Sequence, residues 1–88
     1  MDIAHTSAVE RIARVLAGQR LSANAEGQTE SAAGAVDAAW KDYRDDAVAV
    51  LHTLRAPSEA MAAAGDVAIW ERMVLAAIKE ARPAGIVM

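Results

Sequence analysis

Most of the side-chain types that could perform chemistry in this 88-residue chain occur in one stretch, WKDYRDDAVAVLH, from Trp40 to His52. It holds the only tyrosine, one of two tryptophans, one of two histidines and three aspartates. A carboxylate beside an imidazole can act in general acid–base catalysis or bind a metal ion. Whether this stretch is a site therefore depends on how its backbone arranges these side chains.

The spacing of the stretch is typical of a helix, and on a helix Asp45 and His52 share one side. They are seven residues apart, which places them about 10.5 Å from each other along the axis. Metal ligands on one helix are instead spaced i, i+3 or i+4. The other histidine, His5, lies far away in sequence, and its spacing from the other candidate residues does not indicate a shared site. We therefore predict a solvated acidic face, no enzymatic activity, and no metal, cofactor or small-molecule ligand.

A second set of candidate residues is basic. Arg11, Arg14 and Arg20 give the N-terminal region a positive character, which raises nucleic-acid association as an alternative function. The chain as a whole carries a net charge of −3, and Glu10 lies beside these arginines. Because duplex binding depends on a dense cationic surface, the sequence favours a protein partner over nucleic acid.

The third set of candidate residues is apolar. In the last predicted helix, Leu75 lies among Glu71, Arg72 and Lys79, and Ile69 also lies off the main apolar stripe. A helix that is apolar on more than one side indicates a second packing surface. Ile69 and Leu75 are therefore predicted to contact a partner, either another protein or a second copy in a homodimer. The leading functional hypothesis is a non-catalytic protein–protein interaction or structural module.

Composition and periodicity predict the elements that position these residues. Of the apolar residues, 23 are alanine, which favours helix formation but adds little buried area per residue. Capping, glycine and proline signals divide residues 1–88, a single domain, into helices over about 7–17, 33–55, 57–64 and 66–82, with a long loop over 18–31. Ser7 and Asp66 are predicted N-caps, Gly18 a helix stop, and Pro57 the first residue of the short helix.

The resulting prediction is an all-α, three-helix bundle with one additional short helix. The side chains expected in its core are the larger apolar ones on the inward stripes: Ile12, Leu16, Trp40, Tyr43, Leu51, Leu54, Trp70, Met73 and Val74. The absence of cysteine and of a basic, apolar N-terminal leader predicts a cytoplasmic protein. No run approaches the ~20 apolar residues of a membrane span, so no membrane association is expected.

Several motifs also occur in a recognisable order: ERIARVL from Glu10, Trp40-x-x-Tyr43, AVAVLHTLR from Ala47, PSEAM from Pro57, and Trp70-x-x-Met73. In this order the chain resembles small uncharacterised helical proteins of alphaproteobacteria, which are often found among phage-derived genes. The resemblance covers most of the chain outside residues 19–31. It implies an all-helical fold and carries no catalytic or binding residues over to this sequence.

Overall fold

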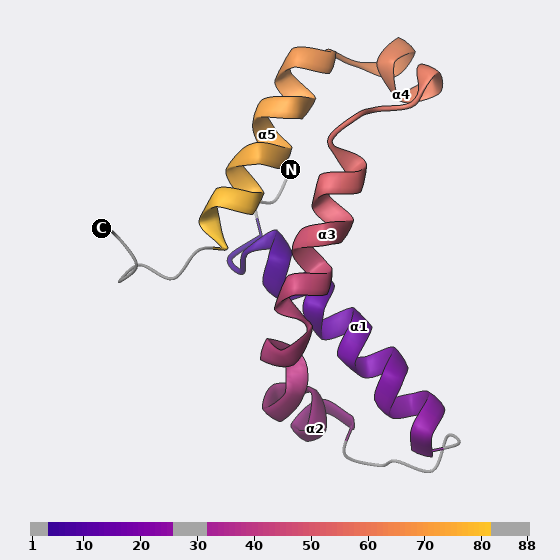
Figure 1. Cartoon of the computed structure of the whole chain (residues 1–88), viewed down its shortest axis with the longest axis vertical. Helices are drawn as coiled ribbons and strands as arrows, with labels where there is room; N and C mark the ends of the chain where they lie inside the picture. The colour runs from indigo at the N-terminus through magenta and orange to yellow at the C-terminus, as the bar shows by residue number, and fades with distance from the viewer. Residues whose placement is uncertain (1–3, 26–31, 82–88) are drawn as a thin grey trace.

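The computed structural model describes residues 4–25 and 32–81, which form five α-helices and one 3₁₀ helix. These elements are α1 (Ala8–Ala25), α2 (Ala32–Ala39), η1 (Trp40–Tyr43), α3 (Arg44–Leu54), α4 (Glu59–Ala64) and α5 (Val67–Glu80). The prediction of an all-helical chain is confirmed for these residues. Figure 1 shows their arrangement.

Helix α1 begins where the sequence predicts and ends much later. The hydroxyl oxygen of Ser7 accepts a hydrogen bond from the backbone N–H of Glu10 at 3.1 Å, so the predicted N-cap is confirmed. The predicted stop at Gly18 is wrong, because the helix continues to Ala25 and replaces the first half of the expected 18–31 loop. A Cβ atom at Gly18 would lie 3.7 Å from Val36 of α2. Packing of α2 against this part of α1 therefore compensates for the low helix propensity of glycine. Residues 26–31 of that loop lie outside the described residues.

The predicted helix over 33–55 is divided into α2, η1 and α3. The break is not imposed by a helix-breaking residue, since neither glycine nor proline occurs between Val36 and Ala56. The chain tightens into a 3₁₀ turn at Trp40–Tyr43, with Tyr43 at φ −102° and ψ 10°. Trp40 and Tyr43 pack against the hydrophobic core, which includes Val9 and Ala13 of α1. Tertiary packing thus accounts for a break that local propensity does not show.

The two C-terminal helices are capped by side chains. The Ser58 hydroxyl oxygen accepts from Met61 N at 3.3 Å, and the Asp66 carboxylate accepts from Ile69 N at 3.0 Å. The Asp66 cap is confirmed. Pro57 is not the first residue of α4 as predicted, because Ser58 is the N-cap and the helix begins at Glu59. Helix α5 ends at Glu80, two residues before the predicted limit.

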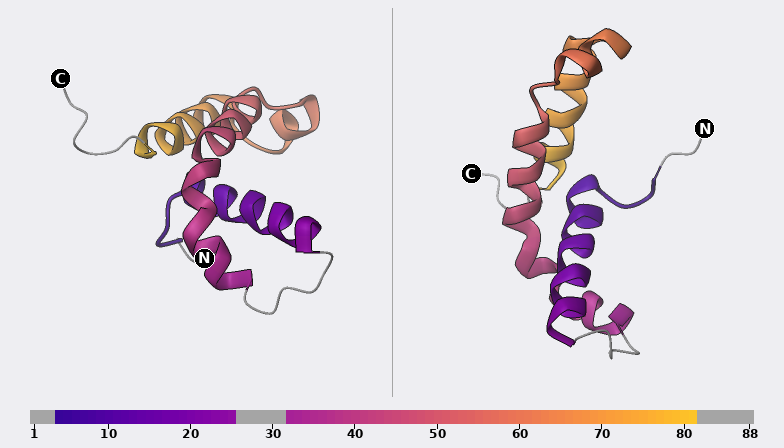
Figure 2. Two further views of the ribbon diagram at one scale, coloured as in Figure 1. Left: turned by 60° about the horizontal axis from the view of Figure 1, so that its bottom comes forward. Right: turned by 90° about the vertical axis from the view of Figure 1, so that its right-hand side faces the viewer.

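Helix α3 joins the two ends of the molecule. It packs on α1 at its N-terminal half and on α5 at its C-terminal half, whereas α1 and α5 contact each other much less. The two further views show the α3–α5 pair lying across one end of α1, with α4 set apart beyond it (Figure 2). The arrangement is open rather than compact, with principal extents of 43 × 38 × 25 Å and a radius of gyration of 15.4 Å where about 12 Å is typical of this length.

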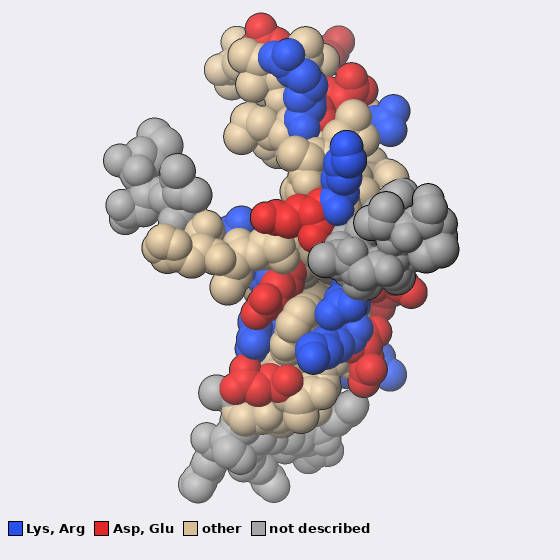
Figure 3. All heavy atoms as spheres, turned by 90° about the vertical axis from the view of Figure 1, so that its left-hand side faces the viewer, with Lys and Arg blue, Asp and Glu red and all other residues tan. Residues whose placement is uncertain are grey.

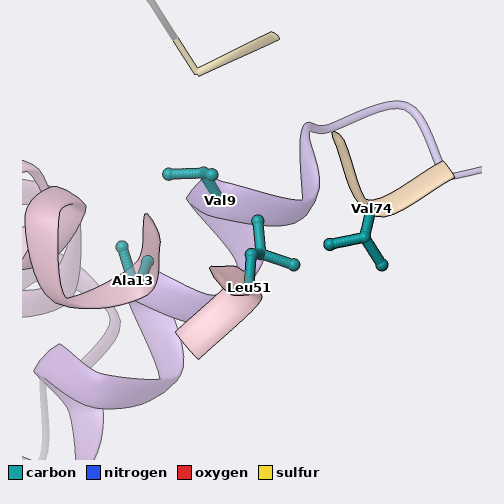
Figure 4. Packing of buried hydrophobic residues seen from close by; sticks show 5 residues of the cluster. Val9, Ala13, Leu51 and Val74 are labelled. Carbon is teal, nitrogen blue, oxygen red and sulfur yellow. The ribbon is translucent and has the colours of Figure 1, made fainter. Parts of the chain in front are cut away.

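The core is small and rich in alanine. The buried side chains of the described residues are Val9, Ala13, Ala17, Ala47, Leu51 and Val74. Figure 4 shows Leu51 of α3 between Val9 of α1 and Val74 of α5. Leu51 thereby links the side chains of three helices.

Most of the larger side chains predicted for this core are only partly buried or are exposed. Leu51 and Val74 are confirmed, and Ile12, Leu16, Trp40, Tyr43 and Trp70 are partly buried. Leu54 and Met73 are 41% and 62% exposed, so their assignment to the core is wrong. Alanines on the facing sides of α1 and α3 let the two backbones approach closely, which leaves larger side chains at the margins.

Candidate functional site

The acidic and histidine residues that first suggested chemistry do not assemble into a site. Asp45 and His52 are exposed on α3, and His5 is exposed before α1. The hollows described below are lined by other residues. Within residues 4–25 and 32–81, no three histidine or acidic side chains are grouped closely enough to hold a metal ion.

Arg14 contacts two carboxylates and an aromatic ring. Its guanidinium donates to the Asp37 carboxylate on α2 and, at 2.8 Å, to the Glu10 carboxylate one turn earlier on α1. The Arg14 guanidinium carbon also lies 5.4 Å from the centroid of the Trp40 ring, and the Arg44 guanidinium carbon lies 5.3 Å from the same centroid. Both are cation–π contacts. Hydrogen bonding to Asp37 and then to Glu10 raises the pKa of Arg14 above its ordinary value. Arg14 thus joins α1 to α2 and η1.

The three arginines do not form one basic face. Because α1 continues beyond Gly18, Arg20 belongs to the same helix as Arg11 and Arg14. Nine residues separate Arg11 from Arg20, which places them about 180° apart around the axis. Arg11 and Arg20 are exposed on these opposite sides. Nucleic-acid association stays a prediction, and a salt-dependent mobility shift on duplex DNA tests it.

The described surface has an apolar hollow of about 340 Å³ where α4 faces α5. Its lining includes Met61 of α4 and Val67, Ile69, Trp70 and Met73 of α5. Val67, Ile69 and Met73 are 46%, 47% and 62% exposed. Asp66 is the one charged residue among the described lining, and its carboxylate already accepts from Ile69 N. A ligand in this hollow would therefore meet apolar side chains and almost no polar group that could orient it.

Two contacts hold α5 beside α3 and so shape this hollow. The Trp70 indole N–H donates to the carbonyl oxygen of Leu54, at the end of α3, with a length of 2.7 Å. The Arg55 guanidinium lies 3.5 Å from the Glu71 carboxylate. Because the Trp70 hydrogen bond reaches the last turn of α3, it satisfies a carbonyl that the helix itself leaves without a partner.

A second, wider hollow of about 690 Å³ shares Trp70 and Met73 with the first. It lies between α5 and the start of α1, and Leu51 and Ala77 also line it. Met73, the most exposed of the large apolar side chains, therefore stands at the edge of both hollows. We use the name docking face for Met61, Val67, Ile69, Trp70 and Met73.

The predicted partner residues Ile69 and Leu75 are both exposed, but they do not belong to one surface. Six positions on a helix place them about 120° apart. Ile69 is part of the docking face, whereas Leu75, 40% exposed, does not line either hollow. Sequence reasoning missed Met61 and Met73. The spacing of Ile69, Met73 and Ala76, at i, i+4 and i+7, is the signal that could have found Met73.

Comparisons of the chain with protein-family models, with curated proteins and with solved structures find no match. The resemblance to small alphaproteobacterial helical proteins accordingly stays a prediction. Over the described ranges, no helix is both long enough and apolar enough to cross a bilayer.

Proposed function

We propose that this chain is a non-catalytic protein–protein interaction module whose contact surface is the docking face of α4 and α5. The observation that carries the proposal is the concentration of exposed apolar side chains there. Four of the eight large, exposed hydrophobic residues in the described part of the chain belong to this face, namely Met61, Val67, Ile69 and Met73. Exposed apolar patches of this kind on small proteins commonly mark contact surfaces.

The chemistry of the face also favours a partner's side chains over a small polar molecule. Methionine adapts its shape to an irregular surface, and tryptophan provides a large, rigid contact area. Trp70 is partly buried and its indole N–H is hydrogen-bonded to the Leu54 carbonyl, so the position of its ring is fixed. The unbranched side chains of Met61 and Met73 beside it are flexible. An amphipathic helix laid into an apolar groove is recognised in this way.

A helical partner also explains the form of the chain. The predicted three-helix bundle needs a third helix along α3 and α5, and α1 contacts α5 only slightly. We infer that a partner helix lies on the docking face, against α4 and α5, and adds a helix that the chain itself does not supply there.

Site-specific photo-crosslinking tests the proposal. A benzoylphenylalanine introduced at Met73 in cells of the source organism should give a discrete crosslinked product after irradiation. The matched control replaces Thr53, which is exposed on α3 away from the docking face, and should give none. Equal products from both positions, or none from Met73, would contradict the proposal.

A further inference from the structure

An exposed side of α5 carries opposite charges in a self-complementary order. Arg72, Ala76 and Glu80 are exposed and occur at i, i+4 and i+8. Each four-residue step turns about 40° around the axis, so the three lie in one strip about 80° wide. Ile69 and Met73 of the docking face fall within or beside the same strip. The upper half of Figure 3 shows basic and acidic side chains interspersed with uncharged surface.

Arg72 and Glu80 cannot satisfy each other within one molecule. Eight residues separate them by about 12 Å along the helix. The described residues three and four positions from either one, Ala68, Ile69, Leu75, Ala76 and Ala77, are all apolar, so neither has an ion-pair partner of the common helical spacing. Within the described part of the chain, the ion pairs formed involve Arg14 and Arg55 instead.

A second α5 supplies both missing partners at once. If two copies cross antiparallel on a two-fold axis at Ala76, Arg72 of each copy lies level with Glu80 of the other. A parallel arrangement would place each charge beside its like. Alanine at the crossing point lets the two helices approach closely, and such a contact is isologous, as in most dimers. Met73, three residues from Ala76, lies next to the crossing and becomes covered.

We infer that α5 binds a second copy of this chain, packed antiparallel about Ala76, with Arg72 of each copy paired to Glu80 of the other. The inference rests on the proposed function, because Met73 of the docking face lies in this contact. The two ion pairs set the direction and register of the contact, and the apolar side chains provide most of its affinity.

A charge exchange tests this arrangement by analytical ultracentrifugation of the full chain. Wild type should show a concentration-dependent dimer. Arg72→Glu and Glu80→Arg should each weaken dimerisation about tenfold, since each turns two attractive pairs into repulsive ones. The double variant Arg72→Glu/Glu80→Arg restores both pairs and should return to within about threefold of wild type. Asp45→Arg, the same change of charge on exposed α3, should have no effect on the dimer.

Glu80 also borders a hollow beside the first turn of α1, so its replacement could affect folding. Thermal unfolding at concentrations below the dimerisation range separates this effect, and the variants should unfold within a few degrees of wild type. A wild-type monomer at several hundred micromolar, or a double variant that dimerises no better than the single variants, overturns the inference. Crosslinking of Met73 to a different protein would overturn it too, while supporting the proposed function.

Discussion

The half of the molecule built by α1, α2, η1 and the start of α3 differs in kind from the half built by α4, α5 and the end of α3. The first half buries alanine and places charged side chains in specific contacts, as Arg14 does with Asp37, Glu10 and Trp40. The second half exposes Met61, Ile69 and Met73 around a hollow. Among the described residues, Val15 is well exposed in the first half, but exposed large hydrophobic side chains are more numerous in the second.

The few large side chains of this alanine-rich chain are distributed unevenly between the two halves. Close approach of α1 and α3 uses alanine at the contact and leaves little room there for Leu or Met. Larger side chains then gather on α4 and α5, where fewer elements cover them. A protein of this size gains only a few kcal/mol from such a core, so burial of the second half against a partner would add considerably to its stability.

The largest expected effect comes from removing the side chain that joins the halves. Leu51→Ala leaves a cavity between Val9 and Val74 and should lower the free energy of unfolding by about 2–5 kcal/mol. Because this approaches the total stability expected for 88 residues, both halves should unfold together. Urea denaturation followed by circular dichroism measures the loss. Leu54→Ala, at an exposed position on the same helix, is the control and should cost much less; equal losses would contradict the division between core and surface.

A smaller effect should follow from cutting the tie between α5 and α3. Trp70→Phe keeps an aromatic ring but removes the indole N–H that donates to the Leu54 carbonyl, and should cost about 1 kcal/mol from the lost hydrogen bond. Trp40→Phe is the matched variant in the first half. It loses similar ring area and part of its arginine stacking, but no indole hydrogen bond within the described residues.

Thermal denaturation of both tryptophan variants gives the comparison. A Trp70→Phe variant as stable as wild type would mean that this hydrogen bond does not hold α5 in place.

The smallest expected effect is a stabilisation of the first half. Gly18→Ala should raise the free energy of unfolding by about 0.5–1 kcal/mol, because alanine has the higher helix propensity and its Cβ would make ordinary contact with Val36 at 3.7 Å. Gly65→Ala, at an open position outside the helices, is the control and should gain less. Destabilisation by Gly18→Ala would indicate that α1 and α2 are too close there to accept a methyl group.

Local signals in the sequence predicted the helix starts well and the helix interiors less well. The caps at Ser7 and Asp66 depend on hydrogen bonds between residues three positions apart, so the sequence contains all that they need. Gly18 and the Trp40–Tyr43 turn depend on contacts with other helices. Their neighbours, Val36 for Gly18 and the α1 core for Trp40, lie far away in sequence.

The candidate site was likewise predictable only where it depends on local sequence. Periodicity predicted that α5 is apolar on more than one side, and Ile69 is exposed and lines the hollow between α4 and α5. It did not show that Met73 faces outward, because an apolar residue near the inward stripe of a helix is indistinguishable from a core residue until its neighbours are known.

Helix propensity and capping act over three or four residues, so local sequence was enough to predict the helical class of the described chain and the caps at Ser7 and Asp66. The packing of the helices was needed to show that alanines form the buried contact, that Arg14 is held by α2, and that Met61, Ile69 and Met73 stay uncovered. Those outcomes depend on which helix surfaces meet, and helices meet through residues that are distant in the chain.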